Sequence, residues 1–394
     1  MDEFIGKIND LFTGNTVHKH EEEKMTFAEI VKKNRFPLEI YSITTEDGYI
    51  LKLFRIPGAK DSTIDPNAPP KQPILFQHGI FDSSDGWICN DCDKCFPFIL
   101  ANLGYDVWLS NSRGNKHCKT HQKHYIDSFE FWQFSFHDMA LYDIPAVINK
   151  LEEVNQSKKK IIYIGHSQGT CLMFALMALK NDYIKEKIKL FVALAPVARV
   201  GGVNSNFLKI LNSIKIEEFF KVTSTYEVFP EDKKASKFTS WVDSNFPSIT
   251  NGMLDLISDN KSILSNNKDR MSIFFHHYPS GCSLKATNHF VQLFRSNKFC
   301  QYDYGKESNM HIYGQIEPKE YQLENINGVA IGLFTGTEDK LATLKDVRWL
   351  KEQLDKNNNV VEYKEFDKMG HLTFLMPLEM KWFDDVLNLI KKYT

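Results

Sequence analysis

The chain has 394 residues, of which 42% are hydrophobic and 13% aromatic, so it can build a large core in one domain with an insertion or in two domains. Its 48 Lys and Arg residues against 50 Asp and Glu residues give a net charge of -2, which argues against a nucleic acid or an anionic membrane as partner. No apolar run approaches the roughly 18 to 20 residues of a membrane-spanning helix, so we expect no transmembrane segment.

The N-terminus and the cysteines bear on the compartment. The first 25 residues form a polar arm that begins acidic and lacks the basic start and apolar centre of a secretory signal. From these residues alone the chain is cytosolic, or its targeting segment lies outside this numbering. Seven cysteines are an odd number and too sparse for a disulfide scaffold. Cys89, Cys92 and Cys95 have metal-ligand spacing, but no second Cys or His pair follows at zinc-site distance, so a loop disulfide or free thiols are favoured over a metal site.

The first regular pattern along the chain is a hairpin. Residues 39–45 and 49–55 alternate apolar and polar side chains around a Glu-Asp-Gly turn, so we expect two antiparallel strands and a chain that starts with β-structure. A Pro-rich loop at 65–70 then leads into the apolar run 73–77, which predicts a short buried strand.

From residue 73 onward, short apolar runs alternate with segments of helical spacing. This alternation predicts a mostly parallel β-sheet flanked by helices, and hence the α/β fold class. The expected strands are 73–77, 105–109, 161–164, 190–195, 329–334 and 360–366, and the expected helices are 96–103, 139–151, 171–179, 345–354 and 379–392.

The alternation stops between about residues 199 and 326, where helical patches rich in Phe and Leu occur without a clean buried strand. This stretch indicates a mostly helical insertion into the α/β core. We therefore expect four parts: an N-terminal arm at 1–25, the first part of the core at 26–198, a helical cap and lid at 199–326, and the second part of the core at 327–394.

The sequence GHSQG at 165–169 lies between the expected strand 161–164 and helix 171–179. Two glycines around a serine at such a junction are typical of the nucleophile elbow of the α/β-hydrolase fold. The glycines remove side chains that would collide with the strand and the helix, and the turn lifts the hydroxyl to the helix N-terminus, where the amide dipoles favour negative charge. We therefore predict Ser167 as the nucleophile.

In this fold an acid and a histidine follow the serine along the chain, in that order. The strand 329–334 is followed by Glu338 and Asp339, of which we predict Asp339 as the acid, with Glu338 as its rival. The strand 360–366 is followed by His371, the last histidine of the chain, which we predict as the general base.

The negative charge that develops on an ester oxygen needs two fixed hydrogen-bond donors. The elbow supplies the backbone N–H of Gln168, immediately after the nucleophile. The loop after the strand 73–77 supplies the second candidate, the N–H of Ile80, with Gly79 allowing close approach. We expect His78, in the same loop, to be a hydrogen-bonded structural residue rather than a catalyst.

With these residues in place, the sequence resembles the acid lipases, the family of gastric lipase and lysosomal acid lipase with relatives in plants, insects and protists. The match runs from about residue 26 to the C-terminus. The motifs GYDVWL and NSRG and the glutamine of GHSQG are far more specific than the elbow alone. The matching stretches are ILFQHGIFDSSDGWI, FILANLGYDVWLSNSRGNKHCKTH, FEFWQFSFHDMALYDIPAVI, IGHSQGT, FVALAPVARV, GLFTGTEDKLATLKDV and MGHLTFL.

This resemblance implies an α/β hydrolase that cleaves neutral lipid esters, triacylglycerols or sterol esters, at mildly acidic pH and without a cofactor. It implies Ser167, Asp339 and His371 as the triad, and the amides of Ile80 and Gln168 as oxyanion donors. Ile80 stands where the family usually has Leu, which is harmless because only its backbone acts. The family suggests a lysosomal or secreted protein, and the N-terminus leaves a cytosolic or lipid-droplet-associated protein as the alternative.

A substrate of this kind is met at a lipid–water interface, so the cap and lid would cover Ser167 with apolar walls that open there. Two other functions remain open: an esterase or thioesterase of other acyl substrates, and a non-catalytic scaffold of the same fold. The residues set no oligomeric state. The apolar wall candidates are Phe207, Leu208, Leu211, Phe219, Phe220, Met253, Leu256, Phe274 and Phe275.

Overall fold

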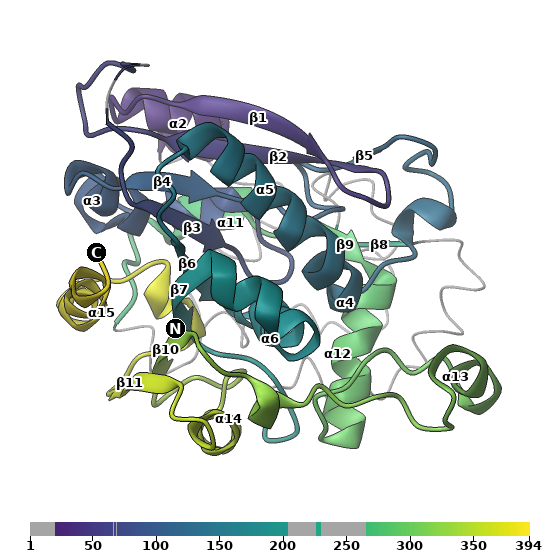
Figure 1. Cartoon of the computed structure of the whole chain (residues 1–394). Helices are drawn as coiled ribbons and strands as arrows, with labels where there is room; N and C mark the ends of the chain where they lie inside the picture. Colours follow the sequence, from purple (N-terminus) through teal and green to yellow (C-terminus); the bar gives the residue numbers. More distant parts are fainter. Residues whose placement is uncertain (1–19, 66, 68, 204–225, 230–264) are drawn as a thin grey trace.

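The structure is a computed structural model that describes residues 20–65, 67, 69–203, 226–229 and 265–394. A nine-stranded sheet forms its centre, in the order β1-β2-β4-β3-β6-β7-β10-β11, with β5 paired beside β2 (Figure 1). The six strands from β4 to β11 are parallel, whereas β1 and β2 are antiparallel to their neighbours. The strands are β1 (Glu39–Thr44), β2 (Tyr49–Ile56), β3 (Pro73–Gln77), β4 (Asp106–Leu109), β5 (Thr120–His121), β6 (Ile161–His166), β7 (Ile188–Leu194), β10 (Ala330–Gly336) and β11 (Val360–Phe366).

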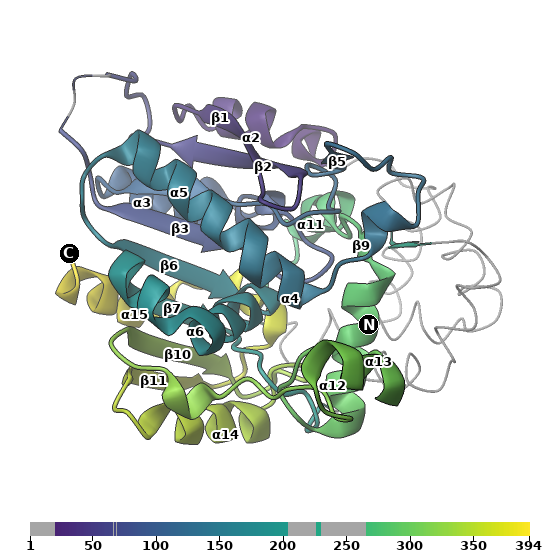
Figure 2. The ribbon, with the colours of Figure 1, turned by 45° about the vertical axis from the view of Figure 1, so that its right-hand side comes forward.

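Helices cover both faces of this sheet (Figures 1 and 2). Helices α5 and α6 lie on one face, and α3 lies on the other, where Phe96 packs edge-on against Trp382 and Phe383 of α15. The α/β class predicted from the alternating pattern is therefore confirmed. The helices of this core are α2 (Phe27–Lys33), α3 (Phe96–Asn102), α4 (Phe136–Asp138), the π-helix η5 (Met139–Asp143), α5 (Ile144–Asn155), α6 (Gln168–Lys187), α14 (Leu344–Asp355) and α15 (Lys381–Lys392), with short 3₁₀ helices at η1 (Glu21–Glu23), η2 (Ser84–Trp87), η3 (Cys92–Lys94), η4 (Glu130–Trp132), η7 (Leu323–Asn325) and η8 (His371–Phe374).

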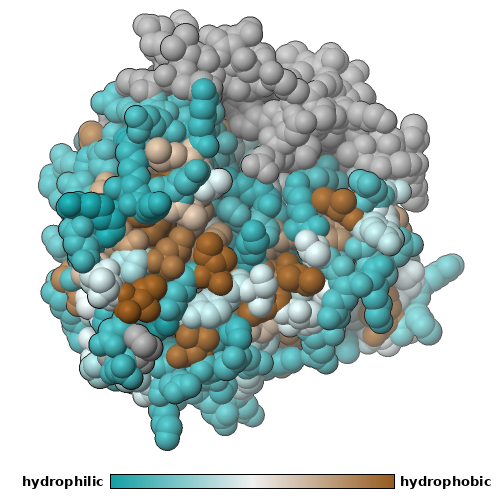
Figure 3. Space-filling model, turned by 90° about the horizontal axis from the view of Figure 1, so that it is seen from above, coloured by the Kyte–Doolittle hydropathy of each residue, from teal (hydrophilic) through white to brown (hydrophobic). Residues whose placement is uncertain are grey.

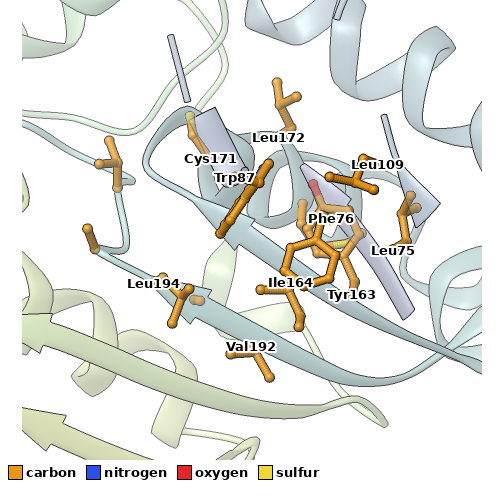
Figure 4. Packing of buried hydrophobic residues seen from close by; sticks show 14 of the residues in the cluster. Leu75, Phe76, Trp87, Leu109, Tyr163, Ile164, Cys171, Leu172, Val192 and Leu194 are labelled. Carbon is orange, nitrogen blue, oxygen red and sulfur yellow. The ribbon is translucent and has the colours of Figure 1, made fainter. Parts of the chain in front are cut away.

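The core is packed around the central parallel strands. All residues of β3, β4 and β6 are buried, as expected for parallel strands with helices on both faces. Figure 4 shows this packing around Phe76, Tyr163 and Val192, with Trp87 reaching in from the loop after β3. The edge of this core carries the site described below.

The first element differs from the expectation that the chain starts with β-structure. Helix α2 precedes β1, and Thr26 and Glu29 form a capping box at its start: the Thr26 amide donates to Glu29 Oε2 at 2.7 Å, and the Glu29 amide donates to Thr26 Oγ1 at 3.3 Å. The spacing Thr-x-x-Glu was present in the sequence, but the polar arm before it hid the helix start.

The segment between β7 and β10 is described at residues 226–229 and from 265 onward. Its described part contains the α-helices α11 (Met271–His277), α12 (Leu284–Ser296) and α13 (Lys306–Tyr313). It also contains the short antiparallel pair β8 (Glu227–Val228) and β9 (Cys282–Ser283), which the sequence pattern did not predict. Phe274 and Phe275 are buried in α11, and the other seven predicted wall residues lie outside the described residues.

The surface is mixed in character. The face above α2, β1 and α5 is mainly hydrophilic and carries separate hydrophobic patches (Figure 3). In the described part of the chain, no helix combines the length and hydropathy that crossing a membrane requires.

Candidate active site

The candidate site residues follow the carboxyl ends of the parallel strands. The register pairs Gln77 of β3 with Gly165 of β6, and Gly336 of β10 with Phe366 of β11, so these strands end level with their neighbours. The chain order of the strands changes direction around β3, which is where open α/β sheets place their ligands. The loops after β3, β6, β10 and β11 therefore meet at one edge of the sheet.

Ser167 occupies a strained turn between β6 and α6. Its backbone lies at φ +54° and ψ −120°, outside the regions that a residue with a side chain normally adopts. The turn is held from both sides, because the Ser167 N–H donates to the Leu194 carbonyl at 3.1 Å and its own carbonyl accepts from Thr170 N at 2.9 Å. The structure gives Ser167 the elbow conformation that the motif predicts.

Two glycines let the surrounding backbone approach the serine. A Cβ added to Gly169 would collide with the carbonyl oxygen of Gln77 at the end of β3. A Cβ added to Gly79 would lie 3.1 Å from the Cβ of Ser167. Glycine at these positions lets the loop after β3 lie directly beside Ser167.

His371 and Asp339 form a buried pair. The Nδ1 of His371 lies 2.9 Å from Asp339 Oδ2, and both residues are 5% exposed. The other carboxylate oxygen of Asp339 accepts hydrogen bonds from the amides of Leu341 and Ala342, each at 2.8 Å. The structure therefore brings Asp339 against His371, whereas the rival Glu338 is half-buried and its backbone N–H bonds to Met369.

Asp339 is a carboxylate in this arrangement. Burial raises its pKa, but the charge and hydrogen bond of His371 and the two backbone amides outweigh burial and hold the pKa below its ordinary value. A carboxylate at Nδ1 keeps that proton on Nδ1 and leaves Nε2 of His371 as the basic nitrogen.

His166, which was not predicted as a site residue from the sequence, holds the backbone of His371 through a hydrogen bond. Its Nε2 donates to the backbone carbonyl of His371 at 2.9 Å. Burial and the nearby His371 lower the pKa of His166 to about 3, so its ring is neutral. The residue before Ser167 thus holds the loop that carries His371, and only the fold creates this link.

The two candidate oxyanion donors lie on either side of the serine. Gln168 is the first residue of α6, where backbone N–H groups have no acceptor within the helix. Within the described residues, neither the Gln168 N–H nor the Ile80 N–H has a hydrogen-bond acceptor. Both donors remain available to a bound oxygen.

His78 is a structural residue, as expected. Its Nε2 accepts from the Ser112 N–H at 3.0 Å, and its Nδ1 donates to the carbonyl of Gly79 at 2.8 Å. Burial lowers the pKa of His78 to about 4, so it stays neutral while it holds the loop that carries Ile80.

Ser167, His371 and Ile80 line a cavity of about 30 Å³, whereas Asp339 and Gln168 are not among its walls. Sequence reasoning missed most of its walls, because they come from five different segments that only the tertiary fold brings together. A larger pocket of about 840 Å³ lies elsewhere, between α12 and the segment around Trp132, and includes none of the predicted site residues. The walls of the small cavity are Gly79, Ile80, Asp82, His166, Ser167, Tyr278, Leu341, His371, Leu372 and Leu375.

The cysteines form no site of their own. All seven are free thiols, and burial raises the pKa of Cys89 and Cys95, so neither is a reactive thiolate. Across the described ranges, no cluster of three His, Cys, Asp or Glu residues could hold a metal ion. The loop disulfide considered for 89–95 is not formed in this structure.

Known proteins that are similar to this chain include lipases and other α/β hydrolases. Residues 27–91 match the family model "Partial alpha/beta-hydrolase lipase region", and residues 72–376 match "alpha/beta hydrolase fold". The chain is 34% identical to gastric triacylglycerol lipase of Bos taurus, over 95% of this chain and 91% of the relative. It is 32% identical to lysosomal acid lipase/cholesteryl ester hydrolase of Macaca fascicularis, over 96% and 94%. Among solved structures, an esterase of Exiguobacterium antarcticum shares the fold with a TM-score of 0.51 at 13% identity, over 89% and 98%.

Proposed function

This chain belongs to the acid lipase family of α/β hydrolases, and we propose that it cleaves carboxylic esters of neutral lipids through an acyl-enzyme on Ser167. One observation carries this proposal: the buried pair of His371 and Asp339, with 2.9 Å between Nδ1 and Oδ2, stands at the cavity that Ser167 lines. A serine and a histidine on one cavity, with a buried carboxylate at the other ring nitrogen of that histidine, are the parts of a nucleophilic acyl transfer.

The first half of the reaction forms the acyl-enzyme. The Nε2 of His371 takes the Ser167 hydroxyl proton as the serine oxygen attacks the carbonyl carbon of the ester, and the π electrons of the C=O bond move onto the carbonyl oxygen. The N–H groups of Ile80 and Gln168 stabilise that negative charge, and Asp339 stabilises the imidazolium. The imidazolium then gives its proton to the leaving alcohol oxygen as the ester C–O bond breaks.

Water completes the cycle. His371 takes a proton from a water molecule as its oxygen attacks the acyl carbon, and the same two amides bind the second oxyanion. When the bond to Ser167 breaks, the proton returns to the serine oxygen, and the fatty acid leaves. This cycle uses only groups of the chain and water.

The relatives support the substrate class. Two of them are named for triacylglycerol and for cholesteryl esters, so we propose esters of this neutral class for this chain. The cavity wall includes Leu341, Leu372 and Leu375, which suits an acyl chain. The relatives named as lysosomal and gastric also favour a lysosomal or secreted site of action over the cytosolic alternative.

The size of the cavity supports a cap that opens. At about 30 Å³ the cavity is far smaller than the roughly 300 to 1,000 Å³ that small-molecule sites offer. An ester with a long acyl chain therefore enters only after a wall moves. We propose that the insertion 199–326 forms this wall and opens at a lipid–water interface, and Tyr278, which lies within it, already lines the cavity.

The test compares wild type with Ser167→Ala on emulsified trioleate, a sterol ester, a short nitrophenyl ester and an acyl-CoA. We expect hydrolysis of the two lipid esters by wild type, with a rise in rate once a long-chain ester passes its solubility limit. The alanine variant should lose at least about 10³-fold in kcat and all labelling by a fluorophosphonate, because the nucleophile is gone. If wild type hydrolysed only the nitrophenyl ester or only the acyl-CoA, the protein would be an esterase or a thioesterase and not a lipase. If wild type showed neither turnover nor labelling, the non-catalytic scaffold would be the remaining function.

A further inference from the structure

One wall residue of the catalytic cavity has no part in the reaction described above: Asp82. It is 4% exposed and follows the candidate oxyanion donor Ile80 by two residues. A tight turn fixes it there, since the Asp82 N–H donates to the Gly79 carbonyl at 3.4 Å and Phe81 adopts a left-handed φ of 59°. A carboxyl group is thus built into the oxyanion side of the cavity.

The carboxyl has little to stabilise a negative charge. Its Oδ1 accepts the Ser83 N–H at 2.7 Å, and within the described residues its Oδ2 has no hydrogen-bond donor. The carboxyl packs against the backbone of Gly86, where an added Cβ would collide with it. One hydrogen bond is too few for a buried carboxylate, which usually accepts several or pairs with a cation.

The nearest cation serves another residue. Lys116 Nζ lies 2.6 Å from Asp85, a carboxylate that also bonds to His117 and His277. Lys116, His117 and His277 therefore surround Asp85, and Asp82 is left without a dedicated partner. Burial first, and then the charge of Asp85, raise the pKa of Asp82 to about 7, although Ser83 and Lys116 act in the opposite direction.

The groups that face Asp82 come from three segments. Asp85 and the thiol of Cys89 lie on its own segment, Lys116 comes from the loop after β4, and the Tyr278 hydroxyl comes from the end of α11. Burial, and after it the Asp82 charge, raise the pKa of Tyr278, so this phenol remains neutral whenever Asp82 ionises. Of the groups named here, Asp82 is the one whose charge changes near pH 7. His371, which lines the same cavity, is the proposed general base and is common to the wild type and the variant compared below.

We propose that Asp82 is a charge switch on the oxyanion hole: as a neutral acid it permits the reaction, and as a carboxylate it opposes the oxyanion and shuts hydrolysis down. The inference rests on the proposed ester hydrolysis. The oxyanion forms at the amides of Ile80 and Gln168, and a negative charge fixed on the same wall of a poorly solvated cavity destabilises it. Loss of one proton at Asp82 therefore confines activity to acidic pH.

The experiment measures kcat/KM for a soluble nitrophenyl ester from about pH 5 to about pH 9, for wild type and Asp82→Asn. Asparagine keeps the acceptor for the Ser83 N–H and cannot ionise. We expect wild-type kcat/KM to fall above about pH 7, and the ratio of the values at pH 8 and pH 6 to be about tenfold higher in the variant. If Asp82→Asn does not fold, Asp82→Ala makes the same comparison, because it also removes the ionisable group.

A second readout needs no substrate. Because folding raises the pKa of Asp82, its protonated form stabilises the native state at low pH, and this stabilisation is lost as the pH rises through about 7. The Tm of Asp82→Asn minus that of wild type should therefore grow from about pH 4 to about pH 7 and then level off. This measurement shows that Asp82 titrates, and the activity profile shows that the titration controls the site.

Glu338→Gln is the matched control, because Glu338 is a half-buried carboxyl at the same edge of the sheet without a place on the cavity wall. Its profile should superimpose on that of wild type. An Asp82→Asn profile that also superimposes on wild type would overturn the switch while leaving ester hydrolysis in place. An enzyme that hydrolyses no ester at any pH would instead overturn the proposed function, and the switch with it.

Discussion

Among single residues, the choice between two neighbouring acids is the sharpest test of the site. Asp339→Asn removes the carboxylate from His371 Nδ1, and the amide favours the wrong tautomer of the ring. We expect kcat to fall by roughly 10³-fold to 10⁴-fold, with little change in the apparent affinity for a soluble ester. Glu338→Gln should change kcat by less than about threefold. The comparison is made by steady-state kinetics, and a costlier change at Glu338 would move the acid by one position.

The residues that could be predicted from the sequence are those that belong to local motifs. Ser167 and Gln168 come with the elbow, and Asp339 and His371 each follow a predicted strand, so their meeting at one edge follows from parallel strands alone. Asp82 and His166 could not be found in this way. The role of Asp82 depends on the cavity that it lines, most of whose walls come from distant parts of the chain. The role of His166 depends on the carbonyl of His371, which is 205 residues away.

Among the elements, a buried arginine joins the hairpin to the helical layer. Arg113 is 1% exposed, and its guanidinium bonds to Asp143 at the start of α5 and to Asp47 in the turn between β1 and β2. It also lies 4.0 Å from the ring centre of Tyr49. Arg113→Met would leave two carboxylates without their cation, so the free energy of unfolding should fall by about 3 to 5 kcal/mol.

The control for this prediction is another bidentate pair. Arg348 of α14 bonds to both oxygens of Glu365 on β11 at 2.8 Å, but it is more than half exposed. Arg348→Met should lower the free energy of unfolding by less than about 1 kcal/mol, because water solvates the Glu365 carboxylate once the exposed pair is broken. Urea unfolding of both variants measures the difference, and equal losses would show that burial does not set the strength of the Arg113 cluster.

The elements also show where periodicity stops being informative. The expected helix 139–151 is a π-helix at 139–143 followed by α5, because Pro145 has no N–H to donate to the carbonyl of Leu141 and the turn widens. The pair β8 and β9 has only two residues in each strand, too short for an alternating pattern. Long apolar runs such as β6 were predicted correctly because burial on both faces leaves a continuous signal.

For the whole molecule, three buried histidines set a limit on acid stability. Burial lowers the pKa of His78 to about 4, and of His166 and His289 to about 3. Each depressed pKa contributes stability that is present above about pH 6.5 and is lost as the pH falls through the folded-state value. The native fold should therefore weaken below pH 6.5, on the acidic side where Asp82 is neutral.

His289 offers a clean test of this limit. It stacks on Phe136, and its Nε2 donates to the carbonyl of Cys300 at 2.9 Å. His289→Gln keeps a hydrogen-bond donor and removes the titrating ring. As the pH falls from 7 to 4, the free energy of unfolding of the variant should therefore rise by about 3 kcal/mol relative to that of wild type. Thermal unfolding at several pH values follows this gain. The exposed His311→Gln serves as control, and a parallel gain there would assign the effect to net charge instead.

The order of the proposed catalytic residues along the chain determines when the active site can form during synthesis. Ser167 follows β6, whereas Asp339 and His371 follow β10 and β11, so roughly 200 residues separate the proposed nucleophile from its proposed base. At about 5 to 20 residues per second, a ribosome takes about 10 to 40 s to cover that distance. During this interval the nascent chain carries a serine that nothing activates. Hydrolysis begins only when β10 and β11 have joined the sheet, and the lipids of the compartment where the chain is made are spared until then.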